Sequence, residues 1–261
     1  MRLRPLACVA VALIAACSLT ALAGAEIVQK GGVRVAVTGD LSPKRLPRSG
    51  SAPVRVSVGG EITATDKGEP PKLKTLTIEL NRNGRLDVAG LPVCPYDSIQ
   101  TASTARALAA CREALVGRGS FTAEISLAGQ EPYSTTGTML AFNGREHGQP
   151  VLFGQIYSPR PFATSFVIVF AIGKAGKGAY GTTLTAQLPA SLRSWGNLTG
   201  IELRLARTYV AGGRRHSYIS AGCPAPKGLS KVSFPFARTS FGFQGGPALS
   251  SVLIRSCRAH G

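Results

Sequence analysis

Residues 54–64 read VRVSVGGEITA, with apolar side chains at every second position in Val54, Val56 and Val58. This period of two is the pattern of a β-strand with one buried face. The pair Gly59-Gly60 interrupts the alternation before Ile62, which predicts a bulge or bend in the strand. The same alternation recurs along most of the chain and predicts strands at 33–37, 76–80, 121–127, 138–142, 151–157, 164–172, 182–188, 200–209, 217–220, 232–243 and 249–255.

Two of the predicted strands carry additional information. Residues 166–172 are apolar on both faces, so we expect a central strand that is buried on both sides. In residues 232–243 the apolar positions change phase between Phe236 and Phe241. This change predicts a bulge, or a crossing between two sheets, near Ala237.

A single helix is predicted over residues 101–116, which are rich in Ala. Leu108, Cys111 and Leu115 share one face of that helix, and Gly117 is expected to end it. About a dozen short strands and one short helix predict an all-β fold, namely an antiparallel, jelly-roll-like β-sandwich whose helix is stapled by a disulfide. We expect residues 26–261 to form a single domain, and two β domains at 26–130 and 131–261 are the alternative.

The 261-residue chain is strongly basic, with 30 Lys and Arg against 13 Asp and Glu and a formal net charge of +17. Its hydrophobic content of 44% suffices for a core, and with 31 Gly and 17 Pro it is turn-rich. Wholesale disorder, collagen and long coiled coil are therefore not expected. The charge favours anionic partners such as nucleic acid, acidic polysaccharide, phosphate polymers or anionic lipid. A generally basic protein without a specific partner is the alternative.

Residues 1–25 have the features of a secretory signal peptide. Arg2 and Arg4 precede an apolar run at 6–16, and Ala23-Gly24-Ala25 provides the small residues of a cleavage site before Glu26. Cleavage there leaves a secreted chain with a net charge of +15. Two alternatives stay open: lipid attachment at Cys17, and an uncleaved leader that anchors the chain at the cell surface. No transmembrane span is predicted in the mature chain.

Four cysteines remain after the leader, and an even number in an exported protein indicates disulfides. Four cysteines allow three connectivities, of which we favour the sequence-local one, Cys94–Cys111 with Cys223–Cys257. A zinc site is disfavoured because the chain has no C-x-x-C pair and no clustered His.

Six phrases of the mature chain are distinctive: NRNGRLD (81–87), GLPVC (90–94), ALAAC (107–111), LVGRGSF (115–121), AFNG (141–144) and SAGCP (220–224). They resemble phrases of uncharacterised secreted proteins of high-GC Gram-positive bacteria, a family without an assigned function. The resemblance implies secretion and paired cysteines, and it implies nothing about chemistry.

The best candidate for a metal site is the stretch 79–87, ELNRNGRLD, which is similar to a calcium-binding loop. Glu79 stands at the first position in place of Asp, and Gly90 at the twelfth in place of a bidentate Glu. Arg82 and Arg85 add positive charge within the loop. We therefore expect a turn at Asn83-Gly84 and no metal.

The sequence also lacks the signatures of common enzymes. It has no G-x-S-x-G, phosphate-binding or dinucleotide motif, and His147, His216 and His260 are all expected at the surface. We predict no catalytic residue and no cofactor. Glycoside hydrolysis needs two facing carboxylates, and the candidate pairs are Glu79 or Glu124 with Glu202, which fall on polar faces of predicted strands.

The most suggestive feature is a set of cations on two successive predicted strands joined at 211–213. If these strands pair, the cations form a stripe that follows an anionic polymer, and the interleaved tyrosines offer stacking surface. The predicted site consists of Arg204, Arg207, Arg214, Arg215, Tyr209 and Tyr218. The disulfide Cys223–Cys257 would allow Lys227, Lys231, Arg255 and Arg258 to extend it. The alternative is a solvated face whose charges discourage edge aggregation.

These observations support three hypotheses. The first is a secreted, non-enzymatic protein whose basic surface binds anionic polymers of the cell envelope or extracellular matrix, with strongly salt-dependent affinity. The second is a structural or adhesive envelope protein that pairs with a protein partner through an exposed apolar patch. The third is a glycan-active enzyme with two carboxylates in a groove.

Overall fold

A computed structural model describes residues 24–260 except 67, 127–128, 161–162, 177 and the side chain of Trp195. Cys17 lies outside these residues, and so does the predicted signal peptide except for Gly24 and Ala25. The helices are η1 (Tyr96–Ser98), α1 (Thr104–Cys111), η2 (Arg112–Ala114) and α2 (Ala190–Trp195). The strands are β1 (Glu26–Lys30), β2 (Val33–Ser42), β3 (Arg45–Pro47), β4 (Ala52–Pro53), β5 (Arg55–Ala64), β6 (Leu73–Asn81), β7 (Gly84–Leu86), β8 (Leu115–Ile125), β9 (Tyr133–Glu146), β10 (Gln149–Ser158), β11 (Thr164–Lys174), β12 (Tyr180–Gln187), β13 (Gly196–Leu205), β14 (Thr208–Ala211), β15 (Arg214–Ser217), β16 (Ile219–Ala221), β17 (Lys231–Phe243) and β18 (Leu249–His260).

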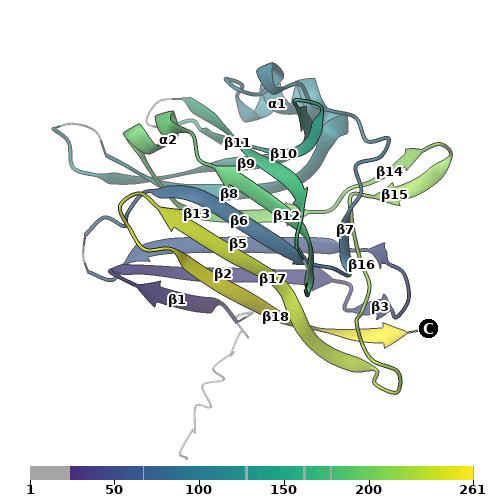
Figure 1. Ribbon diagram of the computed structural model, residues 1–261. Helices are drawn as coiled ribbons and strands as arrows, with labels where there is room; N and C mark the ends of the chain where they lie inside the picture. Colours follow the sequence, from purple (N-terminus) through teal and green to yellow (C-terminus); the bar gives the residue numbers. More distant parts are fainter. Residues whose placement is uncertain (1–23, 67, 127–128, 161–162, 177, 261) are drawn as a thin grey trace, which may run out of the picture.

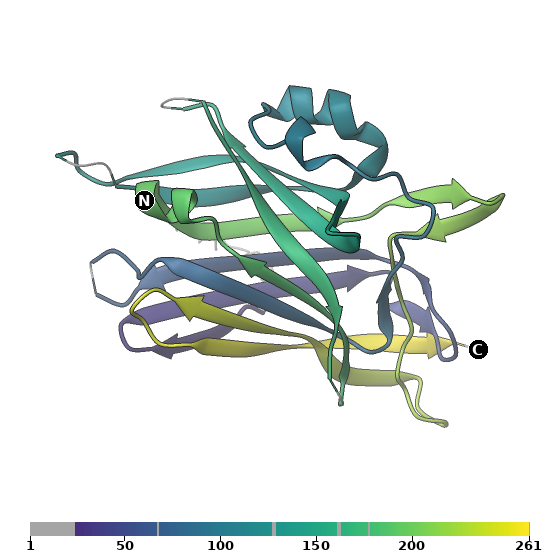
Figure 2. The ribbon, with the colours of Figure 1, turned by 45° about the horizontal axis from the view of Figure 1, so that its top comes forward.

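The fold is dominated by one curled sheet, which confirms the prediction of a mostly β protein. Its thirteen strands in the described chain follow the order β1-β2-β5-β13-β8-β9-β10-β11-β12-β6-β17-β18-β3. The curl brings β1 and β2 beside β18, so the two ends of the sheet lie close together (Figures 1 and 2). The alternative prediction divides the chain into two domains at residue 130. In the strand order, strands from before residue 130 alternate with strands from after it. The jelly-roll sandwich stays a prediction, because this pairing describes a single curled sheet.

Strict alternation of side chains builds the interior of the curl. On β2, Val33, Val35 and Val37 are buried, whereas Arg34 between them is exposed. The inward residues of the other strands join them in one apolar cluster. Each such side chain contributes roughly 1.5–3 kcal/mol when it is fully buried, so the interior is the main source of stability.

A second, smaller apolar cluster lies on the outer side of β9, β10 and β11. There α1 covers the sheet, as Figure 2 shows, and the predicted Cys94–Cys111 disulfide ties α1 to the segment before it. Val167 packs in this outer cluster and Ile168 in the main interior. The prediction of a central strand at 166–172 is confirmed, because β11 lies between β10 and β12. Both of its faces are buried only around Val167 and Ile168, and Ala171 is exposed.

The helix is shorter than the predicted 101–116. Ser103 caps its N-terminus by accepting a hydrogen bond from the backbone N–H of Arg106, and α1 ends at Cys111. Leu115 already pairs with Phe142 of β9, so strand pairing takes over where the helix was expected to continue. Gly117 is not a helix stop. It lies inside β8, where a Cβ atom would come within 2.7 Å of the Arg204 carbonyl.

The strand irregularities are partly as predicted. The register of β17 against β18 shifts between Pro235 and Ala237, which confirms the bulge near Ala237. No shift occurs at Gly59-Gly60, where β5 pairs continuously with both neighbours. The irregularity lies on the adjacent strand instead, between Leu198 and Gly200 of β13.

The second predicted disulfide, Cys223–Cys257, is also present and joins the segment after β16 to β18. Two small sheets accompany the large one: the hairpin β14–β15, and the three strands β4-β16-β7. Both lie toward the end of the molecule where β18 finishes (Figure 1). In residues 24–260, apart from the gaps given above, no helix is long and apolar enough to cross a membrane.

Candidate polyanion-binding surface

The predicted basic hairpin forms, but its two exposed arginines point in different directions. β14 and β15 pair in antiparallel register, with Val210 opposite Arg215 and Ala211 opposite Arg214. Successive residues of a strand point to opposite faces. A polymer lying on one face of the hairpin therefore meets one of these two guanidinium groups and not both.

The two tyrosines of the predicted stripe are buried. Tyr218 is 0% exposed and Tyr209 is 8% exposed. The Tyr209 ring stacks on His216 with 5.3 Å between centroids, and its hydroxyl donates to the carbonyls of Asp87 and Ala89. Burial raises the pKa of both phenols. Because the chain turns inward at Tyr218 to enter β16, neither ring offers the stacking surface expected from the sequence.

The remaining two arginines of the predicted stripe also separate. Arg207 pairs with Glu113 at 3.2 Å, so its charge is largely compensated. Arg204 lies on the outer face of β13, directly opposite Arg118 of β8, and both are exposed. Arg55 of β5 projects from the same face, one diagonal step from Arg204. Arg118 and Arg55 were not identified from the sequence, because only the strand register brings them beside Arg204.

A second group of uncompensated cations lies where β17, β18 and β3 run side by side. Lys231 is opposite Arg258, and Arg258 is in register with Arg45. All three are exposed, and among the described residues none of them has an ion pair or a side-chain hydrogen bond. We call Lys231, Arg258 and Arg45 the basic edge. Lys231 and Arg258 were anticipated as an extension of the stripe, and Arg45 was missed.

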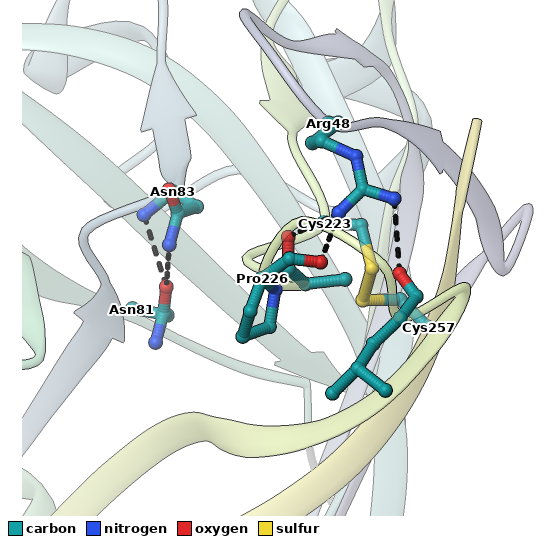
Figure 3. The surroundings of a disulfide bond; sticks show 8 residues. Arg48, Asn81, Asn83, Cys223, Pro226 and Cys257 are labelled. Carbon is teal, nitrogen blue, oxygen red and sulfur yellow. Dashed lines mark hydrogen bonds between the residues drawn. A yellow bond between two sulfur atoms is a disulfide. The ribbon is translucent and has the colours of Figure 1, made fainter. Parts of the chain in front are cut away.

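The backbone beneath the basic edge is well fixed. The Cys223–Cys257 disulfide lies one residue before Arg258, and Leu46 and Ala259 pack inward next to Arg45 and Arg258. Figure 3 shows the guanidinium of Arg48 donating to backbone carbonyls of the loop that leads to β17. The acceptors are Ala225 at 2.6 Å, Leu229 at 2.9 Å and Pro226. These contacts hold the loop that carries Lys227 and position the start of β17.

Arg255, which was expected in the same surface, has a different role. Its side chain is 12% exposed and pairs with Glu26 of β1 at 2.8 Å. It also donates to the carbonyl of Gly39 on β2. Arg255 therefore fastens β18 to the opposite end of the curled sheet and is not available to a ligand.

The carboxylates proposed for glycan chemistry fall into two places. Glu79 of β6 is held by both arms of the Arg238 guanidinium, and this hydrogen bonding lowers the pKa of Glu79 despite partial burial. Glu124 and Glu202 both line a groove of about 670 Å³ on the outer face of β2, β5, β13 and β8, together with Glu61. Glu61 was missed because it follows Gly59-Gly60, where the sequence pattern was read as a bend. We call this hollow the outer groove.

The calcium-like stretch is used for other contacts. Glu79 pairs with Arg238, and Asp87 meets Nδ1 of His216 at 3.0 Å. Burial opposes ionisation of Asp87, but hydrogen bonds from His216 and from the Ala89 backbone hold its pKa below the ordinary value. Asn81 accepts hydrogen bonds from the backbone and side chain of Asn83, which closes the turn (Figure 3). Within the described residues, no group of three or more His, Cys, Asp and Glu is placed to hold a metal.

Exposed large apolar side chains bear on the hypothesis of a protein partner. Val252 and Ile254 both project from the outer face of β18, and Ile27 projects from β1. β1 and β18 belong to opposite ends of the sheet, but the curl places them side by side, so Ile27 lies on a strand next to the one that carries Val252 and Ile254. The same strand β18 thus carries exposed apolar residues in its middle and a cation of the basic edge near its end.

No known protein family, curated protein or solved structure matches this chain.

Proposed function

We propose that this protein is a secreted, non-enzymatic binder of anionic polymers, and that the basic edge is its main contact. The single observation that supports the proposal most directly is the uncompensated row of Lys231, Arg258 and Arg45. Secretion is supported by the two disulfides, which persist in oxidising compartments. Anionic polymers of the cell envelope or extracellular matrix are the partners that such a location makes accessible.

The spacing of the basic edge suits a linear polyanion. Neighbouring strands lie about 4.8 Å apart, so three cations in register extend over about 10 Å across the strands. Arginine presents a planar fork of donors that matches phosphate and carboxylate oxygens, whereas lysine acts as a compact charge. A polymer that crosses the strands can therefore place successive anionic groups on Arg45, Arg258 and Lys231.

The energetics of the row also favour an external anion. Like charges directly opposite on neighbouring strands destabilise a sheet by a few tenths of a kcal/mol or more per pair. The basic edge contains two such pairs, and among the described residues no carboxylate relieves them. Binding of phosphate, sulfate or carboxylate groups removes this repulsion. When these groups belong to a polymer, binding also releases counterions from that polymer.

The test is equilibrium binding of the oxidised chain from Glu26 to Gly261 to a phosphate-linked wall polymer, DNA, an acidic polysaccharide and a neutral glycan. With three phosphate contacts, affinity for a polyanion should fall about 20- to 40-fold between about 50 and 200 mM salt. No binding to any anionic polymer, or binding that salt does not weaken, would contradict the proposal.

A charge-matched pair of variants identifies the contact surface. The triple variant Arg45→Gln, Lys231→Gln, Arg258→Gln removes the basic edge. The control Arg106→Gln, Arg112→Gln, Lys174→Gln removes the same charge from exposed positions elsewhere. We expect the first variant to lose most of the salt dependence and the second to keep it. Equal losses in the two variants would show that net charge, and not the basic edge, governs binding.

A second candidate function, action on a glycan, is favoured by the outer groove. Glu202 lies opposite Gly59 and Glu61 opposite Gly200, so the two carboxylates are diagonal neighbours on one face. Hydroxyls of Ser120, Thr122 and Thr38 share the groove with them. Release of reducing ends from a neutral glycan, abolished by Glu202→Gln and by Glu61→Gln but not by Glu79→Gln, would support this second candidate over the first.

A further inference from the structure

The interior of the curled sheet contains an apolar cavity of about 100 Å³ that the side chains leave unfilled. Its walls come from strands on both sides of the curl and include Ile78 of β6, Met139 of β9, Leu152 of β10, Leu198 and Leu203 of β13, and Leu253 of β18. Among the described residues that line it, no side chain is charged, and the polar ones are three threonines.

The walls of the cavity offer few hydrogen-bond partners to water. A buried water needs two to four polar partners, and apolar cavities without them stay dry. One of the three threonines, Thr239, already donates its hydroxyl to the carbonyl of Ser251, and Thr38 belongs to the outer face of β2. The cavity therefore has the character of a binding site for an apolar molecule. An engineered cavity of about 150 Å³ with similar walls binds benzene or xenon.

Gly60 marks the place where the cavity meets the strand backbone. It lies on the inward face of β5, in register with Val37 and Ile201, yet a Cβ atom built on it meets nothing within 4 Å. The neighbouring inward positions carry apolar side chains. At Gly60 such a side chain is absent, although there is space for one. The cavity is thus produced by a particular residue on β5 as well as by the curvature of the sheet.

The same part of the sheet separates the cavity from the outer groove. Gly59, Gly60, Thr199 and Gly200 line both hollows, so here the wall is little more than strand backbone. The β13 irregularity between Leu198 and Gly200 falls at this thin wall. A small molecule that passes from the outer groove into the interior would have to cross only this thin wall.

We propose that the interior of the curled sheet is a binding site for a small apolar molecule, entered from the outer groove between Gly60 and Gly200. This site is independent of the basic edge. It assigns a role to Gly59-Gly60 and to the β13 irregularity, neither of which the polyanion proposal uses. The site takes a ligand of roughly benzene size or smaller, and it has no group that would recognise a charged one.

The experiment is a titration of the disulfide-bonded chain from Glu26 to Gly261 with xenon and with benzene, followed by methyl NMR. We expect saturable shifts at the methyl groups of Met139, Leu198 and Leu203. Methyl groups of the outer cluster under α1, such as those of Leu140, should not move. The proposal is overturned if the cavity methyls do not respond to either probe, or if Leu140 responds equally.

Two opposite variants sharpen the result. Leu203→Ala enlarges the cavity and should tighten benzene binding about tenfold, whereas Leu140→Ala removes the same side chain from the outer cluster and should not. Gly60→Val fills the cavity and should weaken binding. If Leu203→Ala does not fold, Met139→Ala serves as the enlarging variant. Unchanged benzene affinity in both Gly60→Val and the enlarging variant would place any binding elsewhere.

Discussion

The hairpin β14–β15 and the basic edge both present exposed cations, yet they organise them in different ways. In the hairpin, Arg214 and Arg215 are adjacent in sequence and project from opposite faces of a separate two-stranded sheet. In the basic edge, Lys231, Arg258 and Arg45 come from three strands of the large sheet and project from one face. Density of cations along the chain is therefore a poor guide to density of charge on one surface.

The two regions also differ in how firmly they are held. An isolated two-stranded hairpin is marginally stable, and β14–β15 depends on the contacts of Tyr209 and His216 with the 87–89 turn. The basic edge stands on the Cys223–Cys257 disulfide and on the Arg48 contacts to three backbone carbonyls. A preorganised row loses less conformational freedom on binding, so it should contribute more affinity per cation.

The largest expected effect comes from removing the disulfide beneath the basic edge. The double variant Cys223→Ser, Cys257→Ser opens a loop of 34 residues, and chain entropy predicts a loss of about 4 kcal/mol in the free energy of unfolding. We expect a denaturant midpoint well below that of the parent and weaker polyanion binding at a temperature where the variant is still folded.

The control for this prediction is the other disulfide. Cys94→Ser, Cys111→Ser opens a loop of 17 residues beneath α1 and should cost about 3 kcal/mol. Because it lies in the outer cluster, its removal should leave polyanion affinity of the folded protein unchanged. If both variants bind the polymer equally well, the disulfide beneath the basic edge contributes stability alone.

The next effect compares the two regions directly. The double variant Lys231→Gln, Arg258→Gln changes the basic edge. The double variant Arg214→Gln, Arg215→Gln changes the hairpin. Each double variant removes two positive charges. Loss of two phosphate contacts at the edge should reduce the ratio of affinities at about 50 and 200 mM salt by about 7- to 12-fold. The hairpin variant should lose at most one contact, a reduction of about 3-fold. A larger reduction for the hairpin would move the site to the surface first predicted from the sequence.

Local sequence signals account for much of the fold. Period-two alternation identifies most strands, and the phase change in 232–243 correctly marks the register shift before Ala237. Of the three connectivities that four cysteines allow, the favoured sequence-local one is confirmed for both disulfides. The helix was overestimated because Leu115 has helical spacing from Cys111, whereas its pairing with Phe142 is a long-range contact. Local secondary-structure propensity carries no information about such a long-range contact.

The candidate surface was harder to predict than the fold. Arg45 lies beside Arg258 because β3 and β18, which are distant in sequence, pair in parallel. No local sequence pattern specifies that register. Tyr218 resembles an exposed residue at the end of a polar hairpin, yet the chain enters the core there and the ring is buried. Arg255 alternates like its neighbours, and only the curl of the sheet brings Glu26 to it.

The smallest expected effect concerns the anchoring of the hairpin through Asp87. Its pKa is lower in the folded protein than in the unfolded chain, so ionised Asp87 stabilises the fold above the unfolded pKa of about 3.9. That contribution is lost as the pH falls through the folded pKa. Asp87→Asn should therefore be less stable than the parent by under about 1 kcal/mol near pH 6, since the pair is partly exposed.

The pH profile distinguishes this effect from a change in packing. Denaturant unfolding between pH 6 and pH 2.5 should show the difference between parent and Asp87→Asn shrinking toward the acid end, because the parent loses its carboxylate there. Glu113→Gln, which leaves the hairpin turn intact and removes the partner of Arg207, serves as the control for an exposed ion pair. A difference for Asp87→Asn that stays constant down to pH 2.5 would show that the hydrogen-bond geometry of the 87–89 turn, and not the charge of Asp87, holds the hairpin in place.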